Sequence, residues 1–278
     1  MDPPASFLDR DGFSILCEIE PPRRPDIAHV RAQIDALRPI ADAFLVPDNH
    51  LGHATVSSVA VAHEVAHMGG RSIACINARD RNLLGFRRDL LTAAAYGVNH
   101  FLCVYGDPPA EGRRTDDVTV RGMLDEIHSF GRGPLFEGRP PFRVGTVARP
   151  GRRLGWKVRA DFMFVQVTPA LDRLLQWRDE VDAEGYPGRV YAGVLVLASS
   201  RMARRVNATI PDIHIPDTIV DKLDGNPDIG VELACEQIEA IEGSRAYDGV
   251  HLVPVGRFRE MAARLDNRYR SLGRTSFS

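Results

Sequence analysis

Eight apolar stretches of strand length recur along the chain and alternate with segments of helical periodicity. Because parallel strands need a crossover connection, which a helix usually supplies, this alternation predicts a β/α architecture. Eight such units in 278 residues predict one (β/α)8 TIM barrel, a single catalytic domain over residues 1–278. The predicted strands are 13–19, 41–46, 72–76, 99–104, 142–147, 162–167, 190–197 and 249–253.

The segments between these strands predict the helices, with one weak point. Helices are expected from about residue 26 and over 55–67, 80–96, 117–130, 170–183, 200–207, 216–223, 229–241 and 257–270. Only about fourteen residues separate the fifth strand from the sixth, and several are Arg, Gly or Pro. A crossover needs roughly a dozen residues or more, so we expect the weakest helix there. Residues 1–12 and 271–278 are expected to be flexible termini.

Composition excludes several classes of partner and location. The formal net charge is −2, with acidic and basic residues interleaved, so we expect no nucleic-acid partner and no attraction to anionic membranes. No apolar run approaches ~20 residues, and the first residues lack a basic region followed by an apolar core, so we expect neither a membrane span nor a signal peptide. The four cysteines form no CxxC motif, and Cys17, Cys75 and Cys103 lie in apolar, strand-like runs, which indicates small buried residues of a reduced, cytoplasmic protein.

Acidic residues at strand ends are the first candidates for function, because chemistry in such barrels lies at the carboxyl ends of the strands. Glu18 ends the first strand, and Glu20 lies two residues later, so both side chains should point to the same side. Neighbouring carboxylates raise at least one pKa, and a carboxyl group that keeps its proton near neutrality can act as a general acid. Pairing with Arg23 or Arg24 is the structural alternative.

Asp107 is the second candidate, directly after the fourth strand. Gly106 before it allows a close approach of the backbone, and Pro108-Pro109 after it stiffen the loop. A carboxylate that merely caps a helix or closes a turn is the structural alternative here.

The segment His63-Glu64-Val65-Ala66-His67 matches the HExxH zinc-peptidase motif. Its spacing places both histidines on one helix face, with Glu64 as a base. The longer form of the motif needs a third histidine where this chain has Ile73, and Asp89 is only a distant substitute. We therefore expect an ordinary barrel helix and no metal site. His50 and His53, in the preceding loop, are closer to the predicted active face.

Several motifs together resemble the methylenetetrahydrofolate reductase family. They are Cys17-Glu18-Ile19-Glu20-Pro21-Pro22, Arg79-Asp80-Arg81-Asn82, Gly106-Asp107-Pro108-Pro109, Phe164-Val165-Gln166 with Asp172, Ala192-Gly193-Val194-Leu195, Ile215-Pro216-Asp217 and Gly249-Val250-His251-Leu252. The resemblance covers about residues 13–266. It implies a flavin-bearing (β/α)8 barrel of the cytoplasm. The family passes hydride from NADH or NADPH to FAD and then to 5,10-methylenetetrahydrofolate, which becomes 5-methyltetrahydrofolate.

The resemblance also implies roles for individual residues. Glu18 matches the general acid that promotes opening of the imidazolidine ring, and Asp107 matches a carboxylate near the flavin and pterin that favours the iminium cation. Arg257 matches an arginine that contacts folate. Thr168 stands where the family has a folate-binding glutamine, and Gln166 is a substitute two residues earlier. The implied cofactor site is made of Pro47, Cys75, Asn77, Tyr105, Gly106, Asp107, Arg149 and Lys157.

The chain also departs from the family pattern at the cofactor. Cys75 stands where many members have histidine, Tyr105 where they often have arginine, and Arg149 where an aromatic residue usually packs on the cofactor. The segment from Arg149 to Lys157 is much shorter than the family's equivalent, which supplies a helix that contacts FAD. This shortening predicts weak FAD binding or none, and in the second case nicotinamide would deliver hydride directly to the folate.

Other readings remain open at this level. A zinc peptidase through His63 and His67 and a non-catalytic barrel that binds folate or partners are the alternatives from other classes. The sequence does not distinguish NADH from NADPH, or methionine synthesis from disposal of one-carbon units. It also leaves open whether the chain forms a homo-oligomer.

Overall fold

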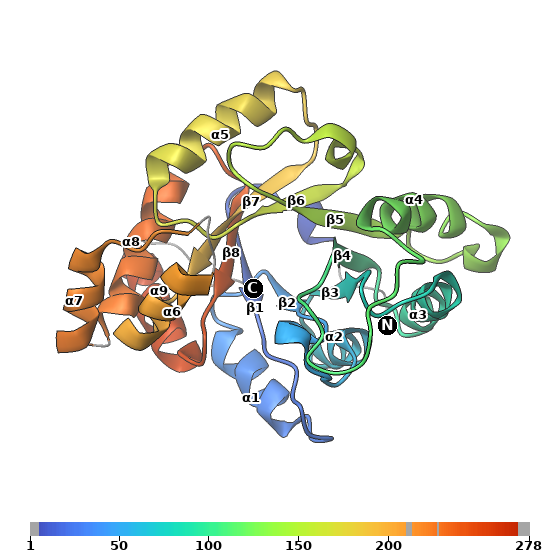
Figure 1. Cartoon of the computed structure of the whole chain (residues 1–278), viewed down its shortest axis with the longest axis horizontal. Helices are drawn as coiled ribbons and strands as arrows, with labels where there is room; N and C mark the ends of the chain where they lie inside the picture. The colour runs from blue at the N-terminus through green and yellow to red at the C-terminus, as the bar shows by residue number, and fades with distance from the viewer. Residues whose placement is uncertain (1–5, 210–212, 227, 272–278) are drawn as a thin grey trace.

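The computed structural model describes residues 6–209, 213–226 and 228–271, and it shows a closed barrel of eight parallel strands in chain order (Figure 1). Each strand pairs with its neighbours in sequence, and β1 pairs with β8 to close the barrel. The (β/α)8 prediction and all eight predicted strands are therefore confirmed. The strands are β1 (Ser14–Glu18), β2 (Ala43–Val46), β3 (Ser72–Asn77), β4 (His100–Val104), β5 (Arg143–Ala148), β6 (Phe162–Val165), β7 (Arg189–Leu195) and β8 (Gly249–Val253).

Helices surround this barrel on the outside (Figure 1). They are α1 (Ala28–Leu37), α2 (Ser58–His67), α3 (Leu83–Ala95), α4 (Val120–Phe130), α5 (Leu171–Ala183), α6 (Ser200–Thr209), α7 (Asp217–Gly225), α8 (Ile229–Ser244) and α9 (Phe258–Ser271). The connection between β5 and β6, where the weakest helix was expected, has no α-helix at all and holds only a short 3-10 helix, η4 (Gly155–Arg159). Within the described ranges, no helix is both long and apolar enough to cross a bilayer.

Alternation along the strands divides the apolar residues into two cores. Ile15 and Cys17 of β1 pack outward beneath the helices, whereas Leu16 between them belongs to a second cluster that fills the barrel. Gly145 of β5 leaves room for the interior cluster, because a Cβ there would meet the Phe162 ring at 2.2 Å. A glycine at this point therefore lets a large aromatic ring occupy the barrel interior.

The amino-terminal end of the barrel is closed by Phe7. This residue lies in the short helix η1 (Phe7–Asp9) and is fully buried. Its ring centroid lies 4.9 Å from that of His100, 5.6 Å from that of Phe162 and 6.0 Å from that of Tyr191. The Ser6 Oγ and His100 Nε2 are 2.7 Å apart. Burial lowers the pKa of His100 to about 4, so its ring is neutral near pH 7.

These contacts correct the expectation that residues 1–12 form a flexible terminus. From Ser6 onward the segment is held by the barrel, because the apolar ring of Phe7 fills an end that would otherwise be open to water. Arg189 of β7 also donates to the carbonyl oxygens of Leu8 and Arg10, at 2.8 and 2.6 Å. Residues 1–5 and 272–278 lie outside the described residues.

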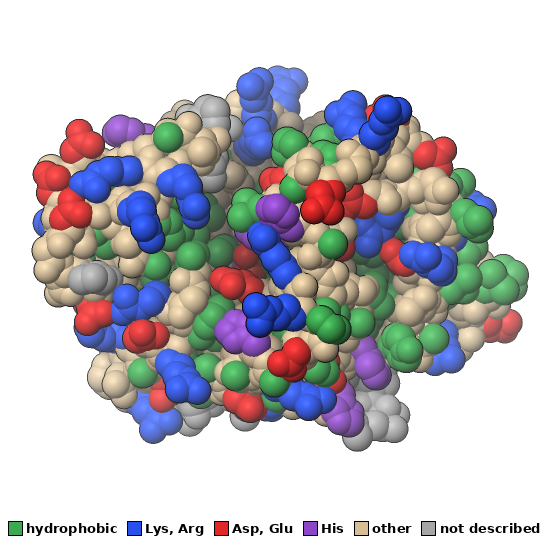
Figure 2. All heavy atoms as spheres, turned by 60° about the horizontal axis from the view of Figure 1, so that its bottom comes forward, with side chains coloured by type: hydrophobic (Ala, Val, Ile, Leu, Met, Phe, Trp, Pro, Cys, Tyr) green, Lys and Arg blue, Asp and Glu red, His purple; other side chains and the backbone are tan. Residues whose placement is uncertain are grey.

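Acidic and basic side chains are interleaved on the molecular surface seen in Figure 2. Many of them form ion pairs between neighbouring helices, such as Arg87 of α3 with Glu126 of α4 and Arg31 of α1 with Glu64 of α2, both at 2.6 Å. This face therefore carries no broad field of one sign, in agreement with the interpretation of the composition.

Replacement of Phe7 tests the role of the barrel plug. Phe7→Ala should lower the free energy of unfolding by about 3–5 kcal/mol, because it leaves a cavity in a fully buried aromatic cluster. Urea denaturation of the variant measures this change. The matched control is Leu84→Ala on α3, where the side chain is 78% exposed and the expected change is within about 0.5 kcal/mol. Equal stability of the two variants would contradict the plug.

Candidate functional site

A cavity of about 700 Å³ opens at the carboxyl ends of the strands, and every strand contributes to its wall. This volume lies within the range of small-molecule and cofactor sites, about 300–1,000 Å³. The cavity brings together most of the site residues that the sequence predicts. Those that line it are Glu18, Pro47, Cys75, Tyr105, Gly106, Asp107, Arg149, Lys157 and Gln166.

Glu18 reaches the cavity from the last position of β1 and lies beside His251 of β8. The Glu18 Oε2 and the His251 Nε2 are 3.2 Å apart, and the two side chains are 16% and 12% exposed. The His251 Nε2 makes no aligned hydrogen bond, so this is a contact at ion-pair distance rather than a directed bond. Phe164 of β6 stacks on the imidazole ring, with ring centroids 4.7 Å apart. A carboxyl group and an imidazole so close can exchange a proton through a small movement.

Asp107 is held on a rigid loop at the opposite side of the cavity mouth. The backbone N–H of Leu51 donates to its Oδ2 at 2.9 Å, and the guanidinium of Arg79 donates to its carbonyl oxygen. Gly52 packs against this loop so closely that a Cβ would meet the Pro108 carbonyl oxygen at 2.1 Å. The loops after β2 and β4 therefore fix each other, and the exposed Asp107 carboxylate has a defined place.

Asn77 lies behind the cavity wall rather than in it. Its side-chain amide donates to the Asp48 Oδ2 at 2.6 Å, and its backbone N–H donates to the same oxygen at 3.0 Å. Arg81 also pairs with Asp48 and, at 2.8 Å, with Asp89. Asp48 itself lines the cavity. The geometry thus makes Asn77 a support for a buried carboxylate.

Lys157 and Arg149 form the basic side of the cavity. The Lys157 Nζ donates to the Val147 carbonyl oxygen at 2.8 Å, so its ammonium is anchored at the end of β5. Burial lowers the pKa of Lys157, and the charge of Arg149 lowers it further. Trp156, the residue before Lys157, adds an aromatic wall.

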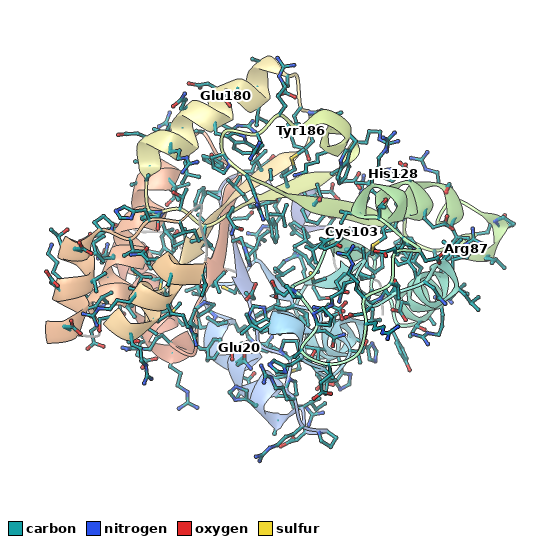
Figure 3. All side chains as sticks on the ribbon, in the orientation of Figure 1. Glu20, Arg87, Cys103, His128, Glu180 and Tyr186 are labelled. Atoms are coloured by element: carbon teal, nitrogen blue, oxygen red, sulfur yellow. The ribbon has the colours of Figure 1, made fainter. Side chains whose placement is uncertain are left out.

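The remaining cofactor candidates have ordinary structural partners. Cys75 lies at the cavity wall, 7% exposed, and burial raises the pKa of its thiol well above the usual value, so it is a neutral, apolar surface. As predicted, Cys17 and Cys103 are buried thiols as well (Cys103 is labelled in Figure 3), and Cys235, for which no burial was predicted, is also buried. Tyr105 is 53% exposed, and its hydroxyl accepts a hydrogen bond from Arg114.

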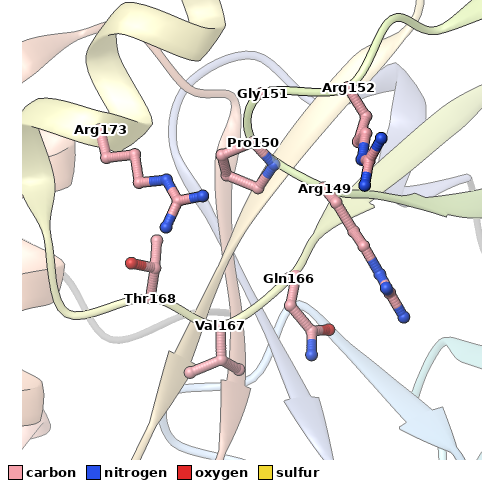
Figure 4. Close-up of a pocket in the computed structure, with 8 residues that line it drawn as sticks. All are labelled: Arg149, Pro150, Gly151, Arg152, Gln166, Val167, Thr168 and Arg173. Atoms are coloured by element: carbon pink, nitrogen blue, oxygen red, sulfur yellow. The ribbon is translucent and has the colours of Figure 1, made fainter. Parts of the chain in front are cut away.

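Three residues expected at the site, Glu20, Thr168 and Arg257, do not line the large cavity. β1 ends at Glu18, so strand alternation does not extend to Glu20, which is exposed on the following loop (Figure 3). This corrects the expectation that Glu18 and Glu20 point to the same side. Thr168 lines a smaller side pocket, shown in Figure 4. Arg257 pairs with Asp228 and Glu260 at the base of α9 and lines neither pocket.

The HExxH segment forms the outer helix α2, as predicted. His63 stacks on Tyr96, with ring centroids 4.5 Å apart, and Glu64 pairs with Arg31. Among the described residues, no three His, Cys, Asp or Glu side chains lie close enough together to hold a metal ion. Asp89, the distant substitute ligand, pairs with Arg81 and Arg88. His50 lines the large cavity, and His53 does not.

Sequence reasoning assigned no role to His251, Phe164 or Trp156, although all three line the cavity. His251 is the residue for which a signal existed. In the alternation of β8, buried Val250 and Leu252 belong to the outer core, so the residue between them faces inward. Its distance from Glu18 could not be read from the chain, because it depends on how β8 joins β1.

Comparison with known proteins supports the fold alone. No family model matches the chain, and no curated protein matches it in sequence. Among solved structures, an uncharacterized protein from Clostridium thermocellum that binds two copies of 5-methyl-5,6,7,8-tetrahydrofolic acid is similar, with 13% identity, a TM-score of 0.63, and 95% of this chain and 98% of that chain covered. DmoA from Hyphomicrobium sulfonivorans is similar with 10% identity, a TM-score of 0.57, and coverage of 96% and 89%.

The lowered pKa of Lys157 gives a pH prediction. The chain has only two lysines, Lys157 and Lys222, so ¹³C-lysine NMR can follow each one. The Lys157 midpoint should lie below 10.5, and Arg149→Gln should raise it by removing a nearby positive charge. Because the unfolded chain binds this proton more tightly, the contribution of Lys157 to stability should rise with pH between the two pKa values. A control, Arg153→Gln, should leave the midpoint unchanged, and a midpoint at or above 10.5 would contradict the burial argument.

Proposed function

We propose that the chain is an oxidoreductase that reduces 5,10-methylenetetrahydrofolate to 5-methyltetrahydrofolate with NADH or NADPH. The observation that carries the proposal is Glu18 at the end of β1, beside His251 and facing a cavity that Asp107 also lines. The positions of Glu18 and Asp107 agree with the roles that the resemblance to the methylenetetrahydrofolate reductase family implies. The folate bound by the structural neighbour supports the same class of ligand.

Glu18 would act as the general acid. Its proton passes to the N10 amine of the five-membered ring, the bond from N10 to the bridging carbon breaks, and an N5 iminium cation remains. A hydride added to that carbon completes the methyl group, so one hydride and one proton are consumed. His251, with its Nε2 3.2 Å from the Glu18 Oε2, is placed to return a proton to the carboxylate.

Asp107 would stabilise the iminium cation through its negative charge. Its carboxylate is fixed before the substrate arrives, because the Leu51 N–H and the contact between Gly52 and Pro108 hold the loop. A fixed charge requires no reorganisation when positive charge develops. Gln166, after β6, would contribute an amide to the pterin, while Thr168 and Arg257 lie outside the large cavity.

The residues fit a flavin ring better than a complete FAD. Apolar walls from Leu102, Val104 and Trp156 suit a flat aromatic ring, and Gly106 permits a close approach of the backbone. Lys157 and Arg149 would face the rest of the cofactor, but the 149–157 segment supplies only the short helix η4. When bound, FAD accepts hydride from the nicotinamide and transfers it to the folate. The short segment favours a second candidate, a reductase in which NADH or NADPH delivers hydride directly.

Glu18→Gln tests the assignment of the acid. The variant should lose about 100-fold or more in turnover, because an amide of the same shape has no proton to donate. NADH- or NADPH-dependent reduction of 5,10-methylenetetrahydrofolate measures the loss, and circular dichroism checks the fold. Glu20→Gln is the matched control, since Glu20 is exposed and outside the cavity. Full activity in the Glu18 variant would defeat the assignment.

A titration with FAD decides between the two routes of hydride. Saturable binding, seen as a perturbed flavin absorbance spectrum, would support the flavoprotein, and the short segment predicts weak binding. Arg149→Tyr should tighten it by restoring an aromatic ring at that position. Reductase activity without any flavin binding would establish direct transfer. Absence of both flavin binding and reductase activity would contradict the proposed reaction.

A further inference from the structure

A side pocket of about 250 Å³ adjoins the large cavity, between the end of β5 and the start of α5 (Figure 4). Arg149, Gln166 and Val167 line both spaces, so the side pocket continues the cavity rather than forming a separate site. Its volume is below the usual range for a whole ligand. A pocket of this size suits one group of a ligand whose remainder lies in the large cavity.

The side pocket is positively charged. Arg152, on the connection between β5 and β6, and Arg173, in the first turn of α5, approach it from two different elements (Figure 4). Neither forms an ion pair with an acidic side chain in the described part of the chain. Many other arginines do, including Arg178 on the same helix, which pairs with Asp182 at 2.7 Å. No acidic residue lines the pocket in the described ranges, and Asp172 beside Arg173 is exposed elsewhere.

Thr168 adds a buried hydroxyl to the lining of the side pocket (Figure 4). Thr168 is 5% exposed, and its Oγ1 accepts the backbone N–H of Ala170 at 3.3 Å, which leaves its own O–H free to donate. Gln237 of α8 donates to the Thr168 carbonyl oxygen at 2.6 Å and thereby fixes the loop. The pocket therefore presents hydrogen-bond donors from three residues around one small space.

We propose that this side pocket binds an anionic group with several oxygens, held by Arg152, Arg173 and the Thr168 hydroxyl. Guanidinium groups bind carboxylates and phosphates through paired hydrogen bonds, and such charge-assisted bonds are among the strongest in proteins. The identity of the ligand rests on the proposed function. The group is then either a carboxylate of the γ-glutamyl chain of folate or the diphosphate of a dinucleotide.

The test is a double variant, Arg152→Gln with Arg173→Gln, which leaves the residues of the large cavity unchanged. The probes are 5-methyltetrahydrofolate with one and with five glutamyl residues, and ADP as the diphosphate, with binding measured by calorimetry. At least one of the pentaglutamyl chain and ADP should bind about 10- to 100-fold more weakly to the double variant than to the wild type. Binding of the monoglutamyl folate should change less than that of the affected probe.

The control is Arg153→Gln, which removes the same charge from an exposed neighbour that lines neither pocket. Its binding constants should equal those of the wild type, and the melting temperatures of all variants exclude unfolding as the cause. A loss confined to the pentaglutamyl folate identifies the carboxylate source, and a loss confined to ADP identifies the diphosphate source. Unchanged binding of both probes, or equal losses in the control, would overturn the side pocket as an anion site.

The side pocket and the proposed reaction are tested separately. Should no folate bind even to the wild type, the proposed function falls, and the ADP series alone still decides the pocket. Should monoglutamyl folate bind and turn over normally while the double variant binds every probe like the wild type, the pocket proposal falls and the reductase stands.

Discussion

Closure of the barrel between β1 and β8 is the constraint on which the site depends. The two strands pair in parallel, with Leu16 opposite His251 and Cys17 opposite Leu252. This register carries the end of β1 to the neighbourhood of His251, so Glu18 meets an imidazole from the other end of the chain. An open sheet would leave both strands with unpaired backbone groups at an edge and would separate the two side chains. Backbone hydrogen bonds of the ladder therefore bring the Glu18 carboxyl group and the His251 imidazole within 3.2 Å of each other.

At the cavity mouth, beyond the strand ends, ion pairs and hydrogen bonds of charged side chains hold the loops in position. Arg79 is 2% exposed and holds Asp80 and the backbone of Asp107, while Arg81 bridges Asp48 and Asp89. Burying such groups is costly unless each charge has a partner, and removal of one partner would leave the other unpaired. The loops at the cavity mouth are thus held by ion pairs that depend on one another, because each arginine joins groups from more than one position. This mutual dependence favours a single arrangement of the cavity mouth.

Features that depend on residues close together in the sequence could be predicted from the sequence. Apolar stretches of strand length predicted all eight strands, and position at a strand end made Glu18 and Asp107 the first candidates for function, both of which line the large cavity. Glu20 was misplaced because β1 ends at Glu18, one residue before the predicted strand end at residue 19, and Glu20 lies on the exposed loop that follows. The contact between His251 and Glu18 and the burial of Phe7 could not be predicted, because both depend on pairings between distant segments. Thr168 and Arg257 follow family positions, yet the loops after β6 and β8 carry them away from the large cavity.

The connection between β5 and β6, which has no α-helix, determines the charge on one side of the cavity. The short connection holds only the helix η4, and it supplies Arg149, Arg152 and Lys157 to the lining of the two pockets. Carboxylates at Glu18, Asp48 and Asp107 lie on the other walls, from β1, β2 and β4. A ligand with a cationic reacting centre and an anionic tail is therefore oriented by the field of the cavity alone, with its tail toward the arginines. In the proposed reaction this places the developing iminium beside the carboxylates whichever donor supplies the hydride.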